Sequence, residues 1–371
     1  METIDLTNAL IDLSGDRSFD ARDIKGALDY LKQIRDQSVD YVIKGKNLEI
    51  KKVDKEKWQL WAETPEGLKV FKPTNYAANQ TIQKTPLPKK YHDTLVERGH
   101  IDEAIAHLNL WLHEDETQRI RAVGPYYRAL VSPSYGAFDN FDIFASTAGV
   151  IMATNMMRGP ETKPARFYRA DISEENMYLS IIDWRRQFDI GGGDLYYPLI
   201  TIKNSEVGAG AFQVDAGFFR YMCENRMLHG VISRRIHRAE KLDVGSYSMD
   251  TIQAQRALVI KIVRDQTGQA FTNDQFFDNL ATSLKEAKEL KLGSPTEAIE
   301  KVSGILNLND DEEQWILDAM AGDTTIMPED RNTAFALING ITLVEKNRSI
   351  ERGMELVHGA GQVKEILKAL A

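Results

Sequence analysis

Apolar positions recur at helical spacing along residues 21–35, and then alternate with polar positions along 41–53 and 57–74. A helix places every third or fourth side chain on one face, whereas a strand places every second side chain there. The first stretch therefore predicts a helix, and the next two predict strands. A polar, proline-bearing link over 75–90 and two further helical patterns follow. We expect residues 1–115 to form a small α+β unit with a helical connector.

The pattern changes after Arg119, where short alternating stretches are separated by turn residues. A helix is expected after the first of these stretches, from about Phe141 to Met156, with Asn140 as its N-terminal cap. Five stretches predict antiparallel strands: 125–132, 165–172, 176–186, 196–206 and 210–216. We expect residues 119–248 to form a central α+β domain.

A glycine-containing turn joins the last two of these stretches. Gly208 and Gly210 are expected to close a hairpin over residues 203–216, since glycine accepts the positive φ angles of tight turns. After Gly217, the order of apolar residues in FFRYMCENRM fits a helix. We expect this helix to bury Cys223, because a lone cysteine with apolar neighbours usually behaves as a small hydrophobic residue.

From residue 249 onward the chain has helical periodicity throughout. The prediction is therefore an α+β protein whose central antiparallel sheet carries packed helices. A small N-terminal α+β unit precedes this sheet, and a helical C-terminal unit, residues 249–371, follows it.

The composition is that of an ordinary globular protein. Of 371 residues, 43% are hydrophobic and 27% are charged, and the formal net charge is −9. No apolar run reaches the ~20 residues that a membrane-spanning helix needs, and the N-terminus carries acidic residues where a secretion signal would carry basic ones. The single cysteine excludes a disulfide framework and a cysteine-rich zinc site. We expect a cytoplasmic protein without membrane contact.

The charge is unevenly spread along the chain. Residues 119–241 carry 16 Lys and Arg against 13 Asp and Glu, and 13 of these 16 cations are arginine. Residues 242–371 carry a net charge of −8. Arginine suits bidentate contacts with phosphate and stacking on bases. The middle of the chain is therefore its only net-positive part, although a folded domain also uses arginine for its own ion pairs.

Signals for catalysis or for a bound cofactor are weak. Gly208 and Gly210 lack the third glycine of a dinucleotide fingerprint, and Gly191–Gly193 lacks the Lys-Ser/Thr of a phosphate-binding loop. The seven histidines repeat no metal-ligand spacing. No motif places a histidine beside Cys223, which disfavours a thiol nucleophile. We expect no catalytic residue, no cofactor and no metal ligand.

Arginine stands beside aromatic residues on successive predicted elements. Arg234, Arg235 and Arg238 also share one face of a predicted helix, opposite its apolar side. A cationic groove with stackable rings is a common solution for binding single-stranded nucleic acid. The residues expected to form it are Tyr127, Arg128, Tyr168, Arg169, Trp184, Arg185, Arg186, Lys203, Arg220, Arg234, Arg235, His237 and Arg238. The alternative is that the rings are core and the arginines only flank them.

Four segments, in order along the chain, carry a family resemblance: YYRALVSPSYGAFDNFDIF (126–144), NSEVGAGAFQVDAGFFRYMCENRM (204–227), IHRAEKL (236–242) and TAFALINGITLVEKN (333–347). They resemble the phage- and plasmid-encoded proteins grouped as domain of unknown function 932. The matching positions are Arg128, Ser132, Tyr135, Asn204 to Gly208, Arg220, Cys223, Asn225, Met227 and His237. Glu224 and Arg226 depart from the family's pattern, so the turn there is expected to differ locally.

This resemblance implies a protein of mobile genetic elements, encoded near genes for recombination or for evasion of host defence. The order of elements is also similar to that of Rad52-like and RecT-like single-strand annealing proteins, an analogy of layout. We therefore predict a non-catalytic protein of the host-cell cytoplasm that binds single-stranded DNA and anneals complementary strands as a homo-oligomer. Arginines would hold phosphates while Tyr127, Tyr168 or Trp184 stacks on bases, so binding would weaken steeply with salt.

Two alternatives stay open. One is an enzyme, either a thiol enzyme or a metal-dependent nuclease whose acids would converge from Asp183, Asp189, Asp194, Glu206 and Asp215. The other is an interaction protein, such as an anti-defence factor, that binds a host or phage protein through the acidic helical tail. The second alternative predicts a large exposed acidic face, with the arginines buried in ion pairs.

Overall fold

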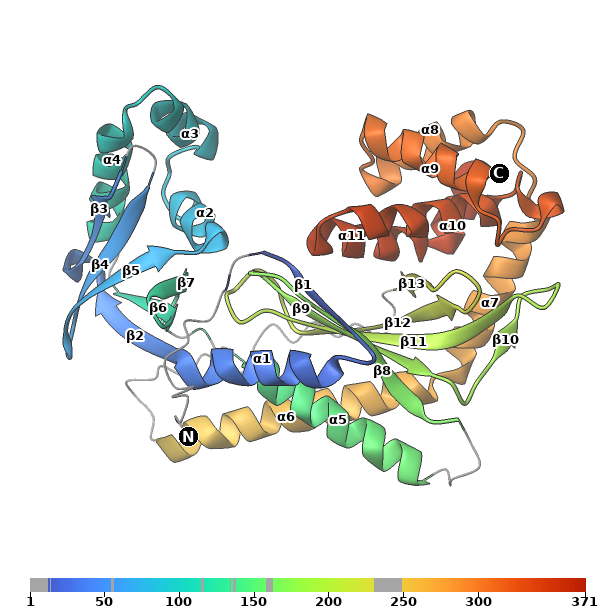
Figure 1. Cartoon of the computed structure of the whole chain (residues 1–371), viewed down its shortest axis with the longest axis horizontal. Helices are drawn as coiled ribbons and strands as arrows, with labels where there is room; N and C mark the ends of the chain where they lie inside the picture. Colours follow the sequence, from blue (N-terminus) through green and yellow to red (C-terminus); the bar gives the residue numbers. More distant parts are fainter. Residues whose placement is uncertain are drawn as a thin grey trace, which may run out of the picture.

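The computed structural model describes residues 13, 15–54, 57–114, 117–133, 135, 138–157, 163–229 and 249–371. The predicted fold class is confirmed: the chain is α+β, with a central antiparallel sheet, a small sheet unit and a helical C-terminal unit. Figure 1 shows the small unit at the upper left, the central sheet above its covering helices, and the helical unit at the upper right. None of the helices within the described ranges is long and apolar enough to span a bilayer.

The small unit is built on a six-stranded sheet. Its strand order is β2 (Ser38–Lys44), β6 (Thr117–Val123), β7 (Tyr126–Val131), β5 (Gly67–Pro73), β4 (Trp58–Thr64) and β3 (Leu48–Lys52). Neighbouring strands are antiparallel, except for the parallel pair β5 and β7. A short 3₁₀ turn, η2 (Gly45–Asn47), joins β2 to β3.

Three helices pack against this sheet: α2 (Asn75–Gln83), α3 (Lys89–Glu97) and α4 (Ile101–Glu114). The first of them corrects the polar link predicted over 75–90. Its N-terminus is capped by Thr74, whose hydroxyl accepts a 3.2 Å hydrogen bond from the backbone of Ala77. The sequence concealed α2 because few of its positions are apolar, with Ala77 and Ile82 facing the core.

Within the described residues, the central sheet has seven strands and curls strongly. Its order is β1 (Arg17–Asp20), β8 (Ala165–Ile172), β9 (Met177–Asp183), β11 (Leu195–Asn204), β12 (Gln213–Arg220) and β13 (Asn225–His229), and the short β10 (Phe188–Asp189) also pairs with β11. The curl brings Tyr168 on β8 within 4.8 Å of Phe219 on β12, measured between ring centroids, although β9 and β11 lie between those strands. The sheet therefore has a concave face.

Helices α1 (Ile24–Gln37), α5 (Asn140–Met157) and α6 (Met249–Thr272) cover the opposite face (Figure 1). One core cluster unites Leu31 of α1, Ile143 of α5 and Phe271 of α6 with apolar residues of the sheet, among them Ile181 and Ile200. Burial of such side chains stabilises the layer by about 25 cal/mol per Å² of apolar surface removed from water.

The helix predicted after Gly217 is wrong, because β12 continues to Arg220 and turns through residues 221–224 into β13. Gly217 lies inside β12, where a Cβ atom would stand 1.8 Å from the carbonyl oxygen of Met227. Glycine is therefore required there by close strand approach and not by a turn. The preceding hairpin is confirmed, with Gly208 at a φ of 84°, whereas Gly210 needs no positive φ.

Strand pairing groups the chain differently from the predicted boundaries 1–115 and 119–248. β6 and β7 complete the small sheet, whereas β1 and α1 belong to the central sheet. Helix α6 also packs beneath the central sheet, although it was assigned to the helical unit over 249–371. These placements depend on pairing between distant segments, which local periodicity does not report.

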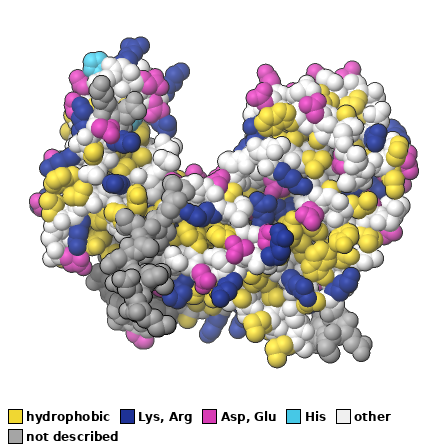
Figure 2. All heavy atoms as spheres, in the orientation of Figure 1, with side chains coloured by type: hydrophobic (Ala, Val, Ile, Leu, Met, Phe, Trp, Pro, Cys, Tyr) yellow, Lys and Arg dark blue, Asp and Glu magenta, His cyan; other side chains and the backbone are white. Residues whose placement is uncertain are grey.

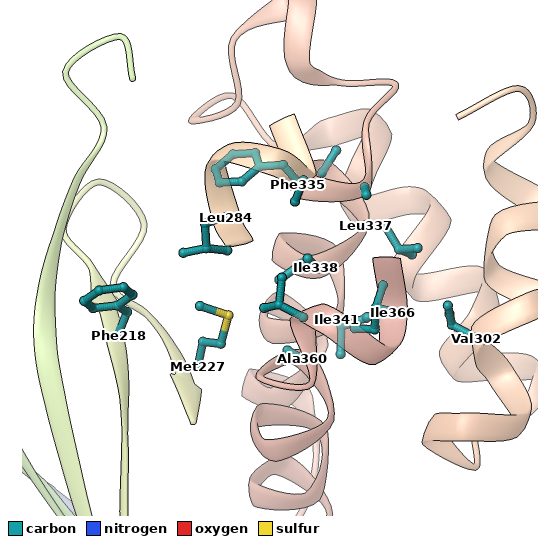
Figure 3. Close-up of a cluster of buried hydrophobic side chains, with 14 of the residues drawn as sticks. Phe218, Met227, Leu284, Val302, Phe335, Leu337, Ile338, Ile341, Ala360 and Ile366 are labelled. Carbon is teal, nitrogen blue, oxygen red and sulfur yellow. The ribbon is translucent and has the colours of Figure 1, made fainter. Parts of the chain in front are cut away.

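The remaining helices form the C-terminal unit: α7 (Asp274–Glu289), α8 (Pro295–Leu306), α9 (Asp310–Gly322), α10 (Ala334–Val344), α11 (Ile350–Ala360) and α12 (Val363–Leu370), with the 3₁₀ turns η3 (Pro328–Asp330) and η4 (Glu345–Asn347). Helix α10 is buried over almost its whole length. Figure 3 shows Phe218 and Met227 of the sheet directed toward Leu284 and Ile338 of these helices. One apolar core thus joins the helical unit to the strands β12 and β13.

Candidate nucleic-acid interface

Tyr127 and Arg128, the first predicted pair, lie on β7 and are both buried. Tyr127 belongs to the core of the small sheet, and its hydroxyl lies 3.1 Å from that of Thr81. Arg128 donates from Nη1 to Oε2 of Glu206, which is buried as well. Since neither side chain reaches the surface, a contact of this pair with nucleic acid is not supported.

Glu206 is the centre of a buried polar cluster that we call the Glu206 junction. Its Oε1 accepts a 2.6 Å hydrogen bond from the backbone N–H of Asn140 at the start of α5. The Asn140 side chain in turn accepts a 2.7 Å hydrogen bond from Nδ2 of Asn204. The members of the junction are Arg121, Arg128, Asp139, Asn140, Asn204 and Glu206. The junction therefore ties β6 and β7 of the small sheet to α5 and to the loop between β11 and β12.

The carboxyl group of Glu206 is held in its charged form. Burial by itself would raise the pKa of Glu206, but the guanidinium groups of Arg128 and Arg121 outweigh that effect. The hydrogen bond from the Asn140 backbone acts in the same direction, and the pKa lies below its ordinary value. Because loss of either partner would leave the other charge buried and unpaired, the fold depends on both, and in this sense the pair is a brace of the fold.

Arg220 lies in a second buried cluster. Its Nε donates to Oδ1 of Asp194 at 2.9 Å, and its Nη2 donates to the carbonyl oxygen of Thr325 at 2.9 Å. Its Nη1 lies 3.4 Å from Oδ1 of Asn339 in α10. Arg220 is 2% exposed, so it ties the helical unit to β12, and the phosphate contact predicted for it is not supported.

Cys223 lies in the turn between β12 and β13 and is partly exposed, instead of being buried in a helix. Nη1 of Arg220 lies 3.5 Å from its Sγ. Burial raises the pKa of the Cys223 thiol more than the nearby guanidinium lowers it. These surroundings disfavour a thiolate nucleophile.

Arg185 and Arg186 follow β9 and are engaged by nearby groups. Arg185 donates from Nη2 to Oδ2 of Asp183 at 2.7 Å, and only 2% of its side chain is exposed. Arg186 pairs with Asp274 at the start of α7 and lies 4.7 Å over the ring of Phe277. Arg185 thus serves the fold, and Arg186 keeps a small exposed surface.

Arg169 and Lys203 retain more exposure. Arg169 on β8 is 36% exposed while its Nε donates to Oδ1 of Asp171 at 2.5 Å. Lys203, near the end of β11, is partly exposed, with Nζ 5.3 Å from the centroid of the Tyr178 ring. Arg234, Arg235, His237 and Arg238 lie outside the described residues, and their role stays a prediction.

Five aromatic side chains meet on the concave face of the central sheet, and we call them the aromatic set: Tyr168, Trp184, Tyr197, Phe219 and Tyr221. The ring of Trp184 lies 4.7 Å from that of Tyr197, 5.7 Å from Phe219 and 6.2 Å from Tyr221, between centroids. Tyr197 and Phe219 are buried, Tyr168 and Trp184 are partly exposed, and Tyr221 is 58% exposed. The exposed and partly exposed rings of the set therefore pack against buried aromatic side chains and present aromatic surface to solvent.

Charged side chains border the aromatic set. Burial and the carboxylate of Glu224 raise the pKa of Tyr168. Arg226 and Arg169 act in the opposite direction on the same hydroxyl, so both are close to it. Arg166, two residues before Tyr168 on β8, is exposed. Figure 2 shows hydrophobic side chains gathered over the right-hand part of the central sheet, with Lys and Arg side chains beside them.

Tyr168 and Trp184 are among the site residues predicted from the sequence. Tyr221 stands there only as a neighbour of Arg220, and Tyr197 is not predicted. A usable signal existed, because Phe219 and Tyr221 are two residues apart and share a face whenever their segment is a strand. Assigning that segment to a helix removed the signal.

In the described part of the chain, no three His, Cys, Asp or Glu side chains are grouped closely enough to hold a metal ion. The nuclease alternative stays a prediction.

Comparison of the chain with known protein families, with curated proteins and with solved structures finds no match.

Proposed function

We propose that the protein binds single-stranded nucleic acid, and specifically DNA, through the aromatic set. The observation that carries the proposal is that Tyr168, Trp184 and Tyr221 offer ring surface to solvent from one packed sheet. Stacking of a base on an aromatic side chain contributes about 1–3 kcal/mol and tolerates any base, because every base has a π-face. Arg166 and Arg169, which lie on β8 together with Tyr168, would attract the phosphates of the bound DNA.

The biological context of the proposal comes from the family resemblance. It is supported by the way the matching positions meet in space: Arg128 joins the segment Asn204 to Gly208 in the Glu206 junction, and Arg220 meets Cys223 and Asn339 in the second cluster. We infer a phage or plasmid protein of DNA metabolism in the cytoplasm of the host, which anneals complementary strands as a homo-oligomer. Light scattering of the free and DNA-bound protein, with an annealing assay on the same samples, tests this part.

Trp184→Ala is expected to weaken binding of a labelled single-stranded oligonucleotide by roughly 5- to 100-fold, because one stacking platform is lost. Fluorescence anisotropy at low salt, with a matched duplex in parallel, measures the effect. Trp184→Phe keeps a ring and should recover most of the affinity. Trp111 on α4 is 39% exposed and lies outside the aromatic set, so Trp111→Ala is the matched control. Equal losses in Trp184→Ala and Trp111→Ala, or no binding by the wild type, would contradict the proposal.

A second variant tests the predicted basic helix. The logarithm of the affinity for a single strand falls with the logarithm of the salt concentration by about 0.7 per phosphate neutralised. Arg234→Ala/Arg235→Ala/Arg238→Ala is therefore expected to reduce the steepness of this salt dependence by about 2. An unchanged salt dependence would show that these arginines do not contact the phosphates. The aromatic set would then be the main component of the interface.

A second candidate function is binding to a host or phage protein. It is favoured by the burial of Arg128, Arg185 and Arg220 in ion pairs, which the interaction hypothesis predicts. Helix α9 also begins with exposed acids, Asp310 and Asp311. If neither single-stranded nor duplex DNA binds at low salt, affinity capture of host proteins with wild type and Asp310→Asn/Asp311→Asn is the experiment that follows.

A further inference from the structure

The turn between β12 and β13 forms a partly exposed tip. The last cross-strand pair is Arg220 with Asn225, which leaves residues 221–224 beyond the ladder. Two large apolar side chains stand exposed there, with Tyr221 58% and Met222 52% exposed. Exposed apolar side chains placed together often mark a site of contact.

The tip is fixed in position by the structure around it. The backbone N–H of Tyr221 donates to the carbonyl of Leu195 at 3.0 Å, and Nζ of Lys346 donates to the carbonyl of Cys223 at 3.0 Å. Glu224 adopts a φ of 54°, a left-handed conformation that few residues other than glycine accept. Such a conformation persists only where surrounding contacts determine it.

Buried ion pairs of two arginines, Arg220 and Arg226, hold the strands on either side of the tip. Arg220, at the end of β12, is bound by Asp194. Arg226, near the start of β13, donates to Asp171 at 2.9 Å and also pairs with Glu345. The backbone of the tip is thus held by neighbouring elements, while the side chains of Tyr221 and Met222 stay exposed.

The tip also adjoins the aromatic set. The ring of Tyr221 lies 6.2 Å from those of Trp184 and Tyr197, between centroids. On the other side of the turn, the Glu224 carboxylate is close enough to the Tyr168 hydroxyl to raise its pKa. Bases stacked along the aromatic set would therefore reach Tyr221, and Met222 is the next residue of the turn.

We propose that Tyr221 and Met222 cover the terminal base pair where a single strand leaves a duplex, so that the protein prefers single-strand/duplex junctions to plain single strands. This inference rests on the proposed function. The exposed face of a terminal base pair is flat and apolar, which suits contact with the exposed Tyr221 ring and the Met222 thioether. Apolar wedges against base steps are a known means by which proteins hold opened DNA.

The first experiment compares affinities for a single strand, for a duplex with a single-stranded overhang and for a blunt duplex, by anisotropy. The wild type should bind the overhang duplex more tightly than the single strand. Met222→Ser should reduce that preference by about three- to tenfold, because the contact loses its apolar area. Met327 is 48% exposed and lies before η3, outside the tip, so Met327→Ser is the control that should keep the preference.

The second experiment uses Cys223, the only cysteine of the chain, as a built-in probe within the tip. A base carrying a mixed disulfide on a short tether is placed at the junction or several nucleotides away, and exchange with Cys223 traps a covalent complex. The reaction is run at mildly alkaline pH, because burial raises the pKa of this thiol. Trapping should concentrate at the junction and vanish in Cys223→Ser.

The outcomes separate the two proposals. Binding of single strands without a preference for the overhang, or with equal trapping at every position, would overturn the role of the tip and leave the proposed function standing. Absence of binding to every DNA would overturn both.

Discussion

Glu206→Gln is expected to lower the free energy of unfolding by about 3–5 kcal/mol, because it leaves a buried guanidinium group without its countercharge. Glu206 is 3% exposed and its partner Arg128 is 5% exposed. Glutamine keeps nearly the same shape as glutamate, so the lost stability would measure the missing charge and not the formation of a cavity. Urea denaturation of the wild type and the variant, followed by circular dichroism, measures the difference.

Two further variants identify the cause of that loss. Glu63→Gln changes an exposed carboxylate on β4 and should stay within about 0.5 kcal/mol of the wild type. Glu206→Gln/Arg128→Met removes both charges together and should recover part of the stability, since an apolar pair avoids the unpaired buried charge. A loss below about 1 kcal/mol in Glu206→Gln would show that the junction is not a brace of the fold.

The same carboxylate predicts a dependence on pH. The pKa of Glu206 in the folded protein lies below its ordinary value of 4.5, so the unfolded chain takes up the proton first as the pH falls. The contribution to stability is therefore complete above about pH 6 and is lost as the pH falls through 4.5 toward the folded value. Across that window, the wild type and Glu206→Gln should converge in stability.

Gly217→Ala is expected to destabilise the protein by about 3 kcal/mol or more, because the added methyl group has no space. It would lie 1.8 Å from the carbonyl oxygen of Met227 and 2.7 Å from Cα of Leu228. Both atoms belong to the backbone of β13, so no side-chain rotation relieves the clash and the two strands must separate. Thermal unfolding and hydrogen exchange of the β13 amides measure the effect.

The matched control for this variant is Gly304→Ala. Gly304 lies on the exposed side of α8, where an added Cβ meets nothing within 4 Å. Alanine there should raise stability by up to about 1 kcal/mol, through its higher helix propensity. If both variants shifted stability in the same direction, the close approach of β12 and β13 would not be the reason for glycine at 217.

Local periodicity predicted most of the individual helices and strands, and failed where a strand is buried on both faces. Along β12 every residue from Val214 to Arg220 is buried, so the segment shows no alternation of apolar and polar positions. A short, continuously apolar run is equally compatible with a helix. The segment from Phe218 to Met227 was therefore assigned to a helix, although it forms a hairpin.

The interface was harder to predict because the partner of an arginine is distant in sequence. Arg128 and Glu206 are 78 residues apart, and Arg226 and Glu345 are 119 apart. Sequence patterns showed that arginines stand beside rings, but not which carboxylates would neutralise them. The rings were the more reliable part of the signal, since strand geometry brings Tyr168 and Trp184 to the same face of the sheet.

The course of the chain has a consequence for how the protein is made. β1 and α1 belong to the central sheet, the small sheet follows, and the chain then returns to the central sheet at α5 and β8. Arg35 at the end of α1 and Asp142 at the start of α5 form an ion pair at 3.3 Å, so the small sheet unit is an inserted domain whose entry and exit lie side by side. β1 pairs with β8, which leaves the ribosome after all six described strands of the insertion. The inserted domain is therefore expected to fold first. The central sheet, which carries the aromatic set, can form only after β8 has been synthesised.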